Sequence, residues 1–130
     1  MPYRHQLRVR YAECDMQGVV FNAHYLGYAD DALSFWMTTF STPMEQMGYD
    51  LMVVHADVDW KGSARFNDVL TVDCALLRRG TTSLVIGYDM SVDERPVCRV
   101  ELTYVGIAAG TDRPMPPPDE FLRAVDDAAA

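Results

Sequence analysis

One long helical segment, set among segments typical of β-strands, is the feature that most restricts how this chain folds. From His24 to about Phe40, apolar residues recur at the helical spacing of three or four positions. These positions are Tyr25, Tyr28, Ala29, Ala32, Phe35, Trp36 and Phe40. The stripe is broad and aromatic, so we expect this helix, about 25 Å long at about 1.5 Å per residue, to be buried along its length.

Most of the remaining chain predicts β-structure. Residues 5–11 alternate between apolar and polar side chains, which predicts a strand whose buried face includes Tyr11. Further strands are predicted after the helix, where β-branched and aromatic residues are frequent, at residues 51–61, 68–78, 82–91 and 97–108. Turn signals at 79–81 and 93–96 predict that consecutive strands pair as hairpins.

The order of these elements predicts the fold class. With 130 residues the chain has the length of one domain, 1–130, in which a Pro-rich exit at 110–118 leads to a short helix at 119–127 capped by Asp119. One strand, one long helix and then a run of strands predict an α+β fold, with a curved antiparallel sheet of about five strands wrapped around the helix. A single helix leaves apolar edges of such a sheet uncovered, which favours a homodimer or a tetramer.

Composition excludes several classes of protein. The hydrophobic fraction of 49% and the charged fraction of 23% are those of an ordinary globular domain. The first ten residues lack the apolar core of a signal peptide, and no stretch approaches the ~20 apolar residues of a membrane helix. A net charge of −8 disfavours nucleic acid as a partner. The widely spaced Cys14, Cys74 and Cys98 indicate reduced thiols in a cytoplasmic protein.

The loop before the long helix carries the candidate chemistry. Asp15 lies in this loop, and an ordinary aspartate is ionised at neutral pH. Gly18 allows a close approach of backbone and ligand, and the helix that follows presents free N–H groups and a partial positive charge at its start. We expect Asn22 to cap this helix. From the loop alone, Asp15 is equally well interpreted as a catalytic acid or as an acid that caps a turn.

The same loop carries a resemblance to a known family. The residues Tyr11, Asp15, Gly18, Val19, Val20 and Tyr25 read Y-x-x-x-D-x-x-G-V-V-x-x-x-x-Y, and residues 64–70 read ARFNDVL. With the order of the elements, these motifs make residues 5–108 resemble the hot-dog-fold acyl-CoA thioesterases of the 4-hydroxybenzoyl-CoA thioesterase type. The resemblance implies hydrolysis of an acyl-CoA or acyl-carrier-protein thioester, without cofactor or metal, at sites between subunits.

The resemblance also implies roles for individual residues. Asp15 acts as nucleophile or as general base on water, while backbone N–H groups around Asn22 polarise the thioester carbonyl. One carboxylate and a pair of N–H groups suffice, because a thiolate leaves readily. A histidine and an asparagine follow the acid in a related branch, and here Asn22 and His24 hold those positions in the opposite order. A plain helix cap at Asn22 and a solvated His24 remain the alternatives.

Substrate-binding residues are expected in two places. Gly18, Val20 and Tyr25 are expected around the acyl group, and the alternative for Tyr25 is a place in the core, where most aromatic residues of the helix are expected. The phosphates of CoA need local cations in a chain of net charge −8, and the β-turn after the third predicted strand supplies basic and hydroxyl groups. The expected phosphate-binding residues there are Arg78, Arg79, Thr82 and Ser83. The alternative is a solvated hairpin tip, and Arg65 is a weaker phosphate candidate.

The sequence also leaves other acidic residues and two rival functions as alternatives. His55, Asp57 and Asp59 share a strand face, which we interpret as a solvent face because no second cluster completes a metal-ligand set. Asp30 is a further candidate acid near the pocket. The rival functions are a non-catalytic acyl-CoA binding module and a hot-dog hydratase or dehydratase that pairs Asp15 with His24.

Overall fold

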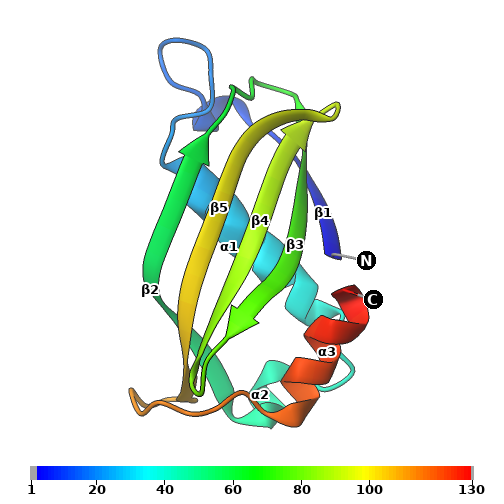
Figure 1. Ribbon diagram of the computed structural model, residues 1–130. Helices are drawn as coiled ribbons and strands as arrows, with labels where there is room; N and C mark the ends of the chain where they lie inside the picture. Colours follow the sequence, from blue (N-terminus) through cyan, green and yellow to red (C-terminus); the bar gives the residue numbers. More distant parts are fainter. Residues whose placement is uncertain (1–2, 130) are drawn as a thin grey trace.

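A five-stranded antiparallel sheet curves around the long helix α1 (His24–Thr38) in the computed structural model, which describes residues 3–129 (Figure 1). Residues 1, 2 and 130 of the predicted single domain therefore lie outside the described residues. The strands are β1 (Tyr3–Arg8), β2 (Tyr49–Trp60), β3 (Val69–Arg79), β4 (Ser83–Val92) and β5 (Arg95–Ala108). Their order in the sheet is β1-β3-β4-β5-β2, so the predicted hairpins β3–β4 and β4–β5 are confirmed.

The helices differ from the prediction at their ends. α1 begins at His24 as expected, but Asn22 does not cap it: the N-cap residue is Ala23, without a side-chain hydrogen bond. The first turn closes instead through the backbone, where the His24 amide donates to the Phe21 carbonyl at 2.9 Å. Three short elements complete the fold: the 3₁₀ turn η1 (Tyr11–Glu13), α2 (Met44–Met47) and α3 (Asp119–Ala129).

Two further expectations about burial are wrong. Tyr11 lies in η1 rather than in a strand, and its side chain is 74% exposed. Phe35 is exposed as well, because it lies on the flank of α1, where its ring stacks on His5 with centroids 4.9 Å apart. α1 is thus buried along one side, and Phe35 lies outside this buried stripe.

The hydrophobic core lies between α1 and the inner face of the sheet. The buried residues of α1 are Tyr25, Tyr28, Ala29, Ala32, Leu33 and Trp36. They pack against alternate residues of the central strands, among them Val72, Ile86 and Leu102, as the period of two in a strand requires. Phe121 of α3 closes one end of this core against Tyr49.

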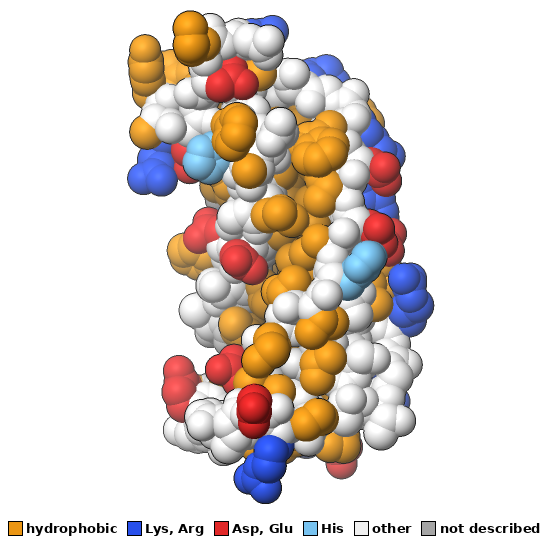
Figure 2. All heavy atoms as spheres, turned by 90° about the vertical axis from the view of Figure 1, so that its left-hand side faces the viewer, with side chains coloured by type: hydrophobic (Ala, Val, Ile, Leu, Met, Phe, Trp, Pro, Cys, Tyr) orange, Lys and Arg blue, Asp and Glu red, His pale blue; other side chains and the backbone are white. Residues whose placement is uncertain are grey.

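β2 is exposed along most of its length although it is rich in apolar residues. It is one of the two edge strands, and Met52, Val53, Val54 and Trp60 are each about half exposed. Figure 2 looks onto the side of the molecule that β2 forms, and hydrophobic side chains run along almost its whole length. Edge strands of this kind are templates for pairing with another chain.

Candidate active site at the Asp15 hairpin

A miniature hairpin holds Asp15 at its turn. Cys14 and Val20 form an antiparallel bridge, and the Asp15 amide donates to the Val19 carbonyl at 2.9 Å. The Gly18 amide then donates back to the Asp15 carbonyl at 3.0 Å. Gly18 has φ +78°, a left-handed conformation that side chains with a Cβ rarely adopt, so glycine is what allows this tight turn.

The two carboxylate oxygens of Asp15 differ in their surroundings. Oδ1 accepts a hydrogen bond of 2.8 Å from the Gln17 amide, which is the turn-capping contact that the sequence left open. Oδ2 has no hydrogen-bond partner within residues 3–129. One oxygen therefore fixes the orientation of the carboxylate while the other remains available to a ligand.

Asp15 borders an open, largely apolar hollow of about 690 Å³. Its other lining residues are Tyr11, Cys14, Met16, Gly18 and Phe66. The rings of Tyr11 and Phe66 contact each other with centroids 5.9 Å apart, and the Met16 side chain is fully exposed. Phe66 and Met16 were not predicted as site residues, although both lie in the two motifs that the sequence singled out. An acid at an apolar hollow suits a substrate with an apolar group beside a reactive carbonyl.

The start of α1 lies directly after this hairpin. The Phe21 amide donates to the Glu13 carbonyl and the Val20 amide to the Ala64 carbonyl, both at 2.9 Å, which fixes the path into the helix. Within residues 3–129, the amides of Asn22 and Ala23 donate to no protein acceptor, while the Asn22 carbonyl accepts from Trp60 Nε1 at 3.2 Å. These amides are therefore available to an oxyanion, and the helix dipole favours negative charge there.

Glu13 anchors the hairpin and was missed by the sequence analysis. Its carboxylate accepts hydrogen bonds from the Arg10 amide at 2.8 Å and from the Tyr28 hydroxyl at 3.0 Å, and it pairs with the Arg10 guanidinium at 3.3 Å. Burial alone raises the pKa of Glu13, but these hydrogen bonds outweigh it and the pKa is lowered. Burial and the Glu13 charge raise the pKa of Tyr28. The pair ties η1 to α1.

His24 is not in the Asp15 hollow. It lines a neighbouring hollow of about 480 Å³ together with Arg8, Arg10 and Glu13. Its ring lies edge-on to Phe21, with centroids 6.0 Å apart. The structure therefore does not bring His24 and Asp15 together around one ligand position.

Val20 and Tyr25 lie in the hydrophobic core, with exposed fractions of 4% and 2%. Burial raises the pKa of Tyr25, whose hydroxyl accepts a hydrogen bond of 3.3 Å from the Ala64 amide. The expectation that these two side chains contact the acyl group is therefore not supported. They instead hold the segment before β3 against the start of α1.

The basic turn expected to bind phosphate lies at the other end of the sheet. The hairpin between β3 and β4 carries Arg78, Arg79, Thr82 and Ser83, and Arg78 is 3.6 Å from Glu101. The opposite end of β3 adjoins the Asp15 side of the molecule, and eleven residues at about 3.3 Å each span about 35 Å. Within one chain, the structure does not bring this turn to Asp15.

The remaining acidic candidates stay apart from the hollow. His55 and Asp57 lie 3.4 Å apart on the exposed β2, and residues 3–129 contain no group of three or more potential ligands spaced to hold a metal. Burial raises the pKa of Asp30, which does not line the Asp15 hollow.

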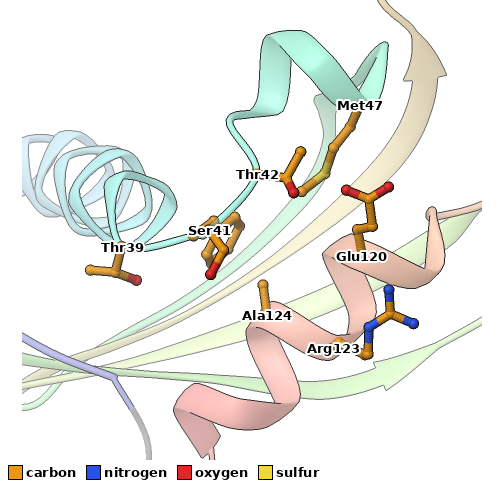
Figure 3. A pocket seen from close by; sticks show the side chains of 8 residues that line it. Thr39, Ser41, Thr42, Met47, Glu120, Arg123 and Ala124 are labelled. Carbon is orange, nitrogen blue, oxygen red and sulfur yellow. The ribbon is translucent and has the colours of Figure 1, made fainter.

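A separate hollow of about 420 Å³ lies between the end of α1 and α3 (Figure 3). Its lining residues are Thr39, Phe40, Ser41, Thr42, Met47, Glu120, Arg123 and Ala124. None of the predicted site residues lies there.

This chain is similar to known proteins both in sequence and in structure. A sequence model of the thioesterase-like superfamily matches residues 9–125. A 1,4-dihydroxy-2-naphthoyl-CoA thioesterase from Synechocystis has a TM-score of 0.86 at 22% identity, covering 100% of this chain and 99% of its own. A thioesterase-superfamily protein from Jannaschia has a TM-score of 0.88 at 20% identity, covering 97% and 92%. The Staphylococcus aureus protein SAV2348, solved in complex with CoA, has a TM-score of 0.86 at 16% identity, covering 98% and 84%.

These structural similarities confirm the predicted hot-dog fold. None of the helices within residues 3–129 combines the length and the apolar character needed to cross a membrane.

Proposed function

Because this chain belongs to the thioesterase-like superfamily, we propose that it hydrolyses an acyl-CoA thioester to the free acid and CoA. The observation that carries the proposal is the Asp15 carboxylate, held by its own turn at the rim of an apolar hollow with one oxygen free. A binding site for an apolar acyl chain needs the hollow but does not need an ionised acid beside it.

The free oxygen of Asp15 supports either of two routes. As a nucleophile, it attacks the thioester carbon, the carbon–sulfur bond breaks, and water then hydrolyses the mixed anhydride. As a general base, it takes a proton from water while the water oxygen attacks the same carbon. Both routes release CoA as a thiolate, which needs little help from an acid because thiols ionise readily.

The amides at the start of α1 complete the proposed site. In either route the carbonyl oxygen becomes negatively charged as the tetrahedral species forms. We assign its stabilisation to the amides of Asn22 and Ala23, which donate to no protein acceptor within residues 3–129. This role belongs to the backbone, so the Asn22 and His24 side chains need not take part.

The proposed enzyme is a homodimer or tetramer that assembles through β2. This strand is a long edge strand with four half-exposed apolar side chains. An antiparallel pairing of two β2 strands satisfies their free backbone groups and removes the apolar band of Figure 2 from water in both subunits.

We also propose a cytoplasmic location, because Cys14, Cys74 and Cys98 form no disulfide.

A non-catalytic acyl-CoA binding module is the second candidate. The observation that favours it is the hydrogen bond from the Gln17 amide, which gives Asp15 a structural role without any catalysis. A hydratase is disfavoured, because His24 and Asp15 line different hollows.

A panel of acyl-CoA thioesters, assayed for free thiol, tests the proposal. We expect at least one acyl-CoA to be hydrolysed. Asp15→Ala should reduce kcat for this substrate about 100-fold or more. Asp112→Ala, which removes an exposed acid from a distant loop, is the matched control and should retain activity. Ligand-induced thermal stabilisation without thiol release, across aromatic, short, branched and long acyl chains, would support the binding module instead.

A further inference from the structure

Building on the proposed function, we infer that the phosphates of CoA are held by basic side chains along residues 61–68. Residues 61–68, which we term the crossover segment, lead from β2 to β3. The basic residues that belong to it or lie against it are Lys61, Arg65, Arg8 and Arg95. Their positions and their lack of acidic partners carry the inference.

The crossover segment adjoins the Asp15 hairpin. Arg65 forms an isolated antiparallel bridge with Val19, the residue whose carbonyl accepts the Asp15 amide. At its other end, the amides of Lys61 and Gly62 both donate to the Val97 carbonyl, at 2.8 and 3.0 Å. The segment therefore runs from the rim of the proposed acyl hollow to the start of β5. The four residue steps from Lys61 to Arg65 span at most about 14 Å.

Two guanidinium groups are oriented by backbone carbonyls of this segment. Arg95 Nη2 donates to the Ser63 carbonyl at 3.1 Å, and the Arg95 side chain passes over Gly62, where a Cβ would lie 3.1 Å from Nη1. Arg8 Nη1 donates to the carbonyl and to the side-chain oxygen of Asn67, at 2.8 and 3.1 Å. A neutral acceptor fixes a guanidinium without cancelling its charge, so both groups remain able to bind an anion.

None of the four basic side chains has a carboxylate within 4.0 Å in residues 3–129, and the same is true of Arg79, Arg113 and Arg123. Arg4, Arg10, Arg78 and Arg99 are all ion-paired. The acid of the segment, Asp68, turns its Oδ2 to the Arg65 amide at 2.8 Å and so caps the backbone. In a chain of net charge −8, this segment keeps an uncompensated positive charge.

The position and charge of the segment fit the phosphate part of CoA. A thioester at Asp15 must place its pyrophosphate and 3′-phosphate some distance along the pantetheine arm. Cations beginning beside Val19 and extending away from the hollow match such an elongated anionic ligand. Arg79, in contrast, lies about 30 Å or more away within the same chain.

Paired substrates test this assignment on the intact protein. Lys61 and Arg65 are exposed, and neither side chain makes a hydrogen bond within residues 3–129, so their removal should leave folding unchanged. We expect Arg65→Ala and Lys61→Ala each to raise KM for an acyl-CoA about tenfold or more. KM for the corresponding acyl-pantetheine, which lacks every phosphate, should be unchanged, and so should kcat. Arg113→Ala removes the same charge from an exposed loop and should alter neither substrate.

Equal effects on both substrates, or no effect on either, would overturn the assignment. So would a selective rise in KM for acyl-CoA in Arg79→Ala but not in Arg65→Ala, since a second subunit would then supply the phosphate site. Calorimetric titration with CoA itself separates this inference from the proposed function. If no thioester is hydrolysed but CoA binds and Arg65→Ala weakens binding about tenfold, the phosphate site stands and the hydrolase proposal fails.

Discussion

The two carboxylate oxygens of Asp15 allow one side chain to serve both the fold and the proposed chemistry. Its Oδ1 is bound by the Gln17 amide, which restricts the carboxylate to one orientation, and its Oδ2 faces no protein donor within residues 3–129. The structural and the catalytic interpretations of the sequence are therefore compatible, because they use different oxygens of the same group. An acid held in this way loses little further freedom when a substrate arrives.

Glu13 predicts how stability depends on pH. Its pKa in the folded chain lies below the ordinary value of 4.5, so its stabilising contribution is present above about pH 4.5 and is lost as pH falls through the lowered pKa. We expect Glu13→Gln to lower the melting temperature clearly at pH 7 and much less at pH 3. Thermal unfolding at both values measures this, with Glu45→Gln, an exposed acid on α2, as control. A deficit of the same size at both pH values would contradict the role given to Glu13.

Single residues were the least predictable part of the site. Asp15 and Gly18 are predicted from their place in the loop and from the family motif, and the structure places both at the hollow. Val20 and Tyr25 match the same motif but lie in the core, because a motif records which residues occur together and not which side chains face a ligand. The cap at Asn22 failed for a local reason, since the chain enters α1 through a backbone hydrogen bond at Phe21.

The packing of α3 and the exit loop against the sheet depends on a glycine in β5. A Cβ at Gly106 would overlap the ring edge of Tyr49 and would lie 2.7 Å from the Met115 carbonyl oxygen. We expect Gly106→Ala to lower the free energy of unfolding by about 1–3 kcal/mol, the usual cost of overpacking. Chemical denaturation measures the change.

Gly27 on the exposed side of α1 is the matched comparison. A Cβ there meets nothing within 4 Å, and alanine is the better helix former. Gly27→Ala should therefore raise the free energy of unfolding by up to about 1 kcal/mol. The packing account would fail if the two substitutions changed stability in the same direction.

Helices and strands could be predicted where the hydrophobic periodicity extends over several helical turns or several residue pairs of a strand. α1 and the two hairpins have long periodic patterns and clear turn residues, and each occurs within a few residues of its expected bounds. η1 and α2 are too short to show a period. The burial of Phe35 was wrongly predicted for another reason. Spacing places a residue on one face of a helix but does not show how much of that face the sheet covers.

At the scale of the molecule, the apolar band on β2 predicts assembly. We expect the wild-type protein to sediment as a dimer or tetramer, and Val54→Lys to shift it towards monomer at the same concentration. Val54 is suited to this test because it lies in a β-bulge, is 54% exposed and has no ladder partner to lose. Leu77→Lys, which changes an exposed apolar residue on β3, should leave the β2 pairing intact. A monomeric wild-type protein would remove β2 from the proposed interface.

The sequence does not predict which segments that are far apart in the chain lie close together in the fold. The sequence predicts a phosphate site at Arg78 and Arg79, and within one chain strand order and strand length place that turn at the opposite end of the sheet from the hollow. The crossover segment comes to the Asp15 hairpin through the bridge between Val19 and Arg65. Such a contact joins residues far apart in the chain and leaves no period or spacing in the sequence.

The most direct measurement of the central claim is the rate of thiol release by Asp15→Asn. Asparagine keeps an oxygen that can accept the Gln17 amide, so the hairpin should remain while the negative charge and basicity are lost. We predict that the melting temperature is unchanged and that kcat for acyl-CoA hydrolysis falls about 100-fold or more. Wild-type turnover in this variant would contradict the claim that the Asp15 carboxylate carries the reaction.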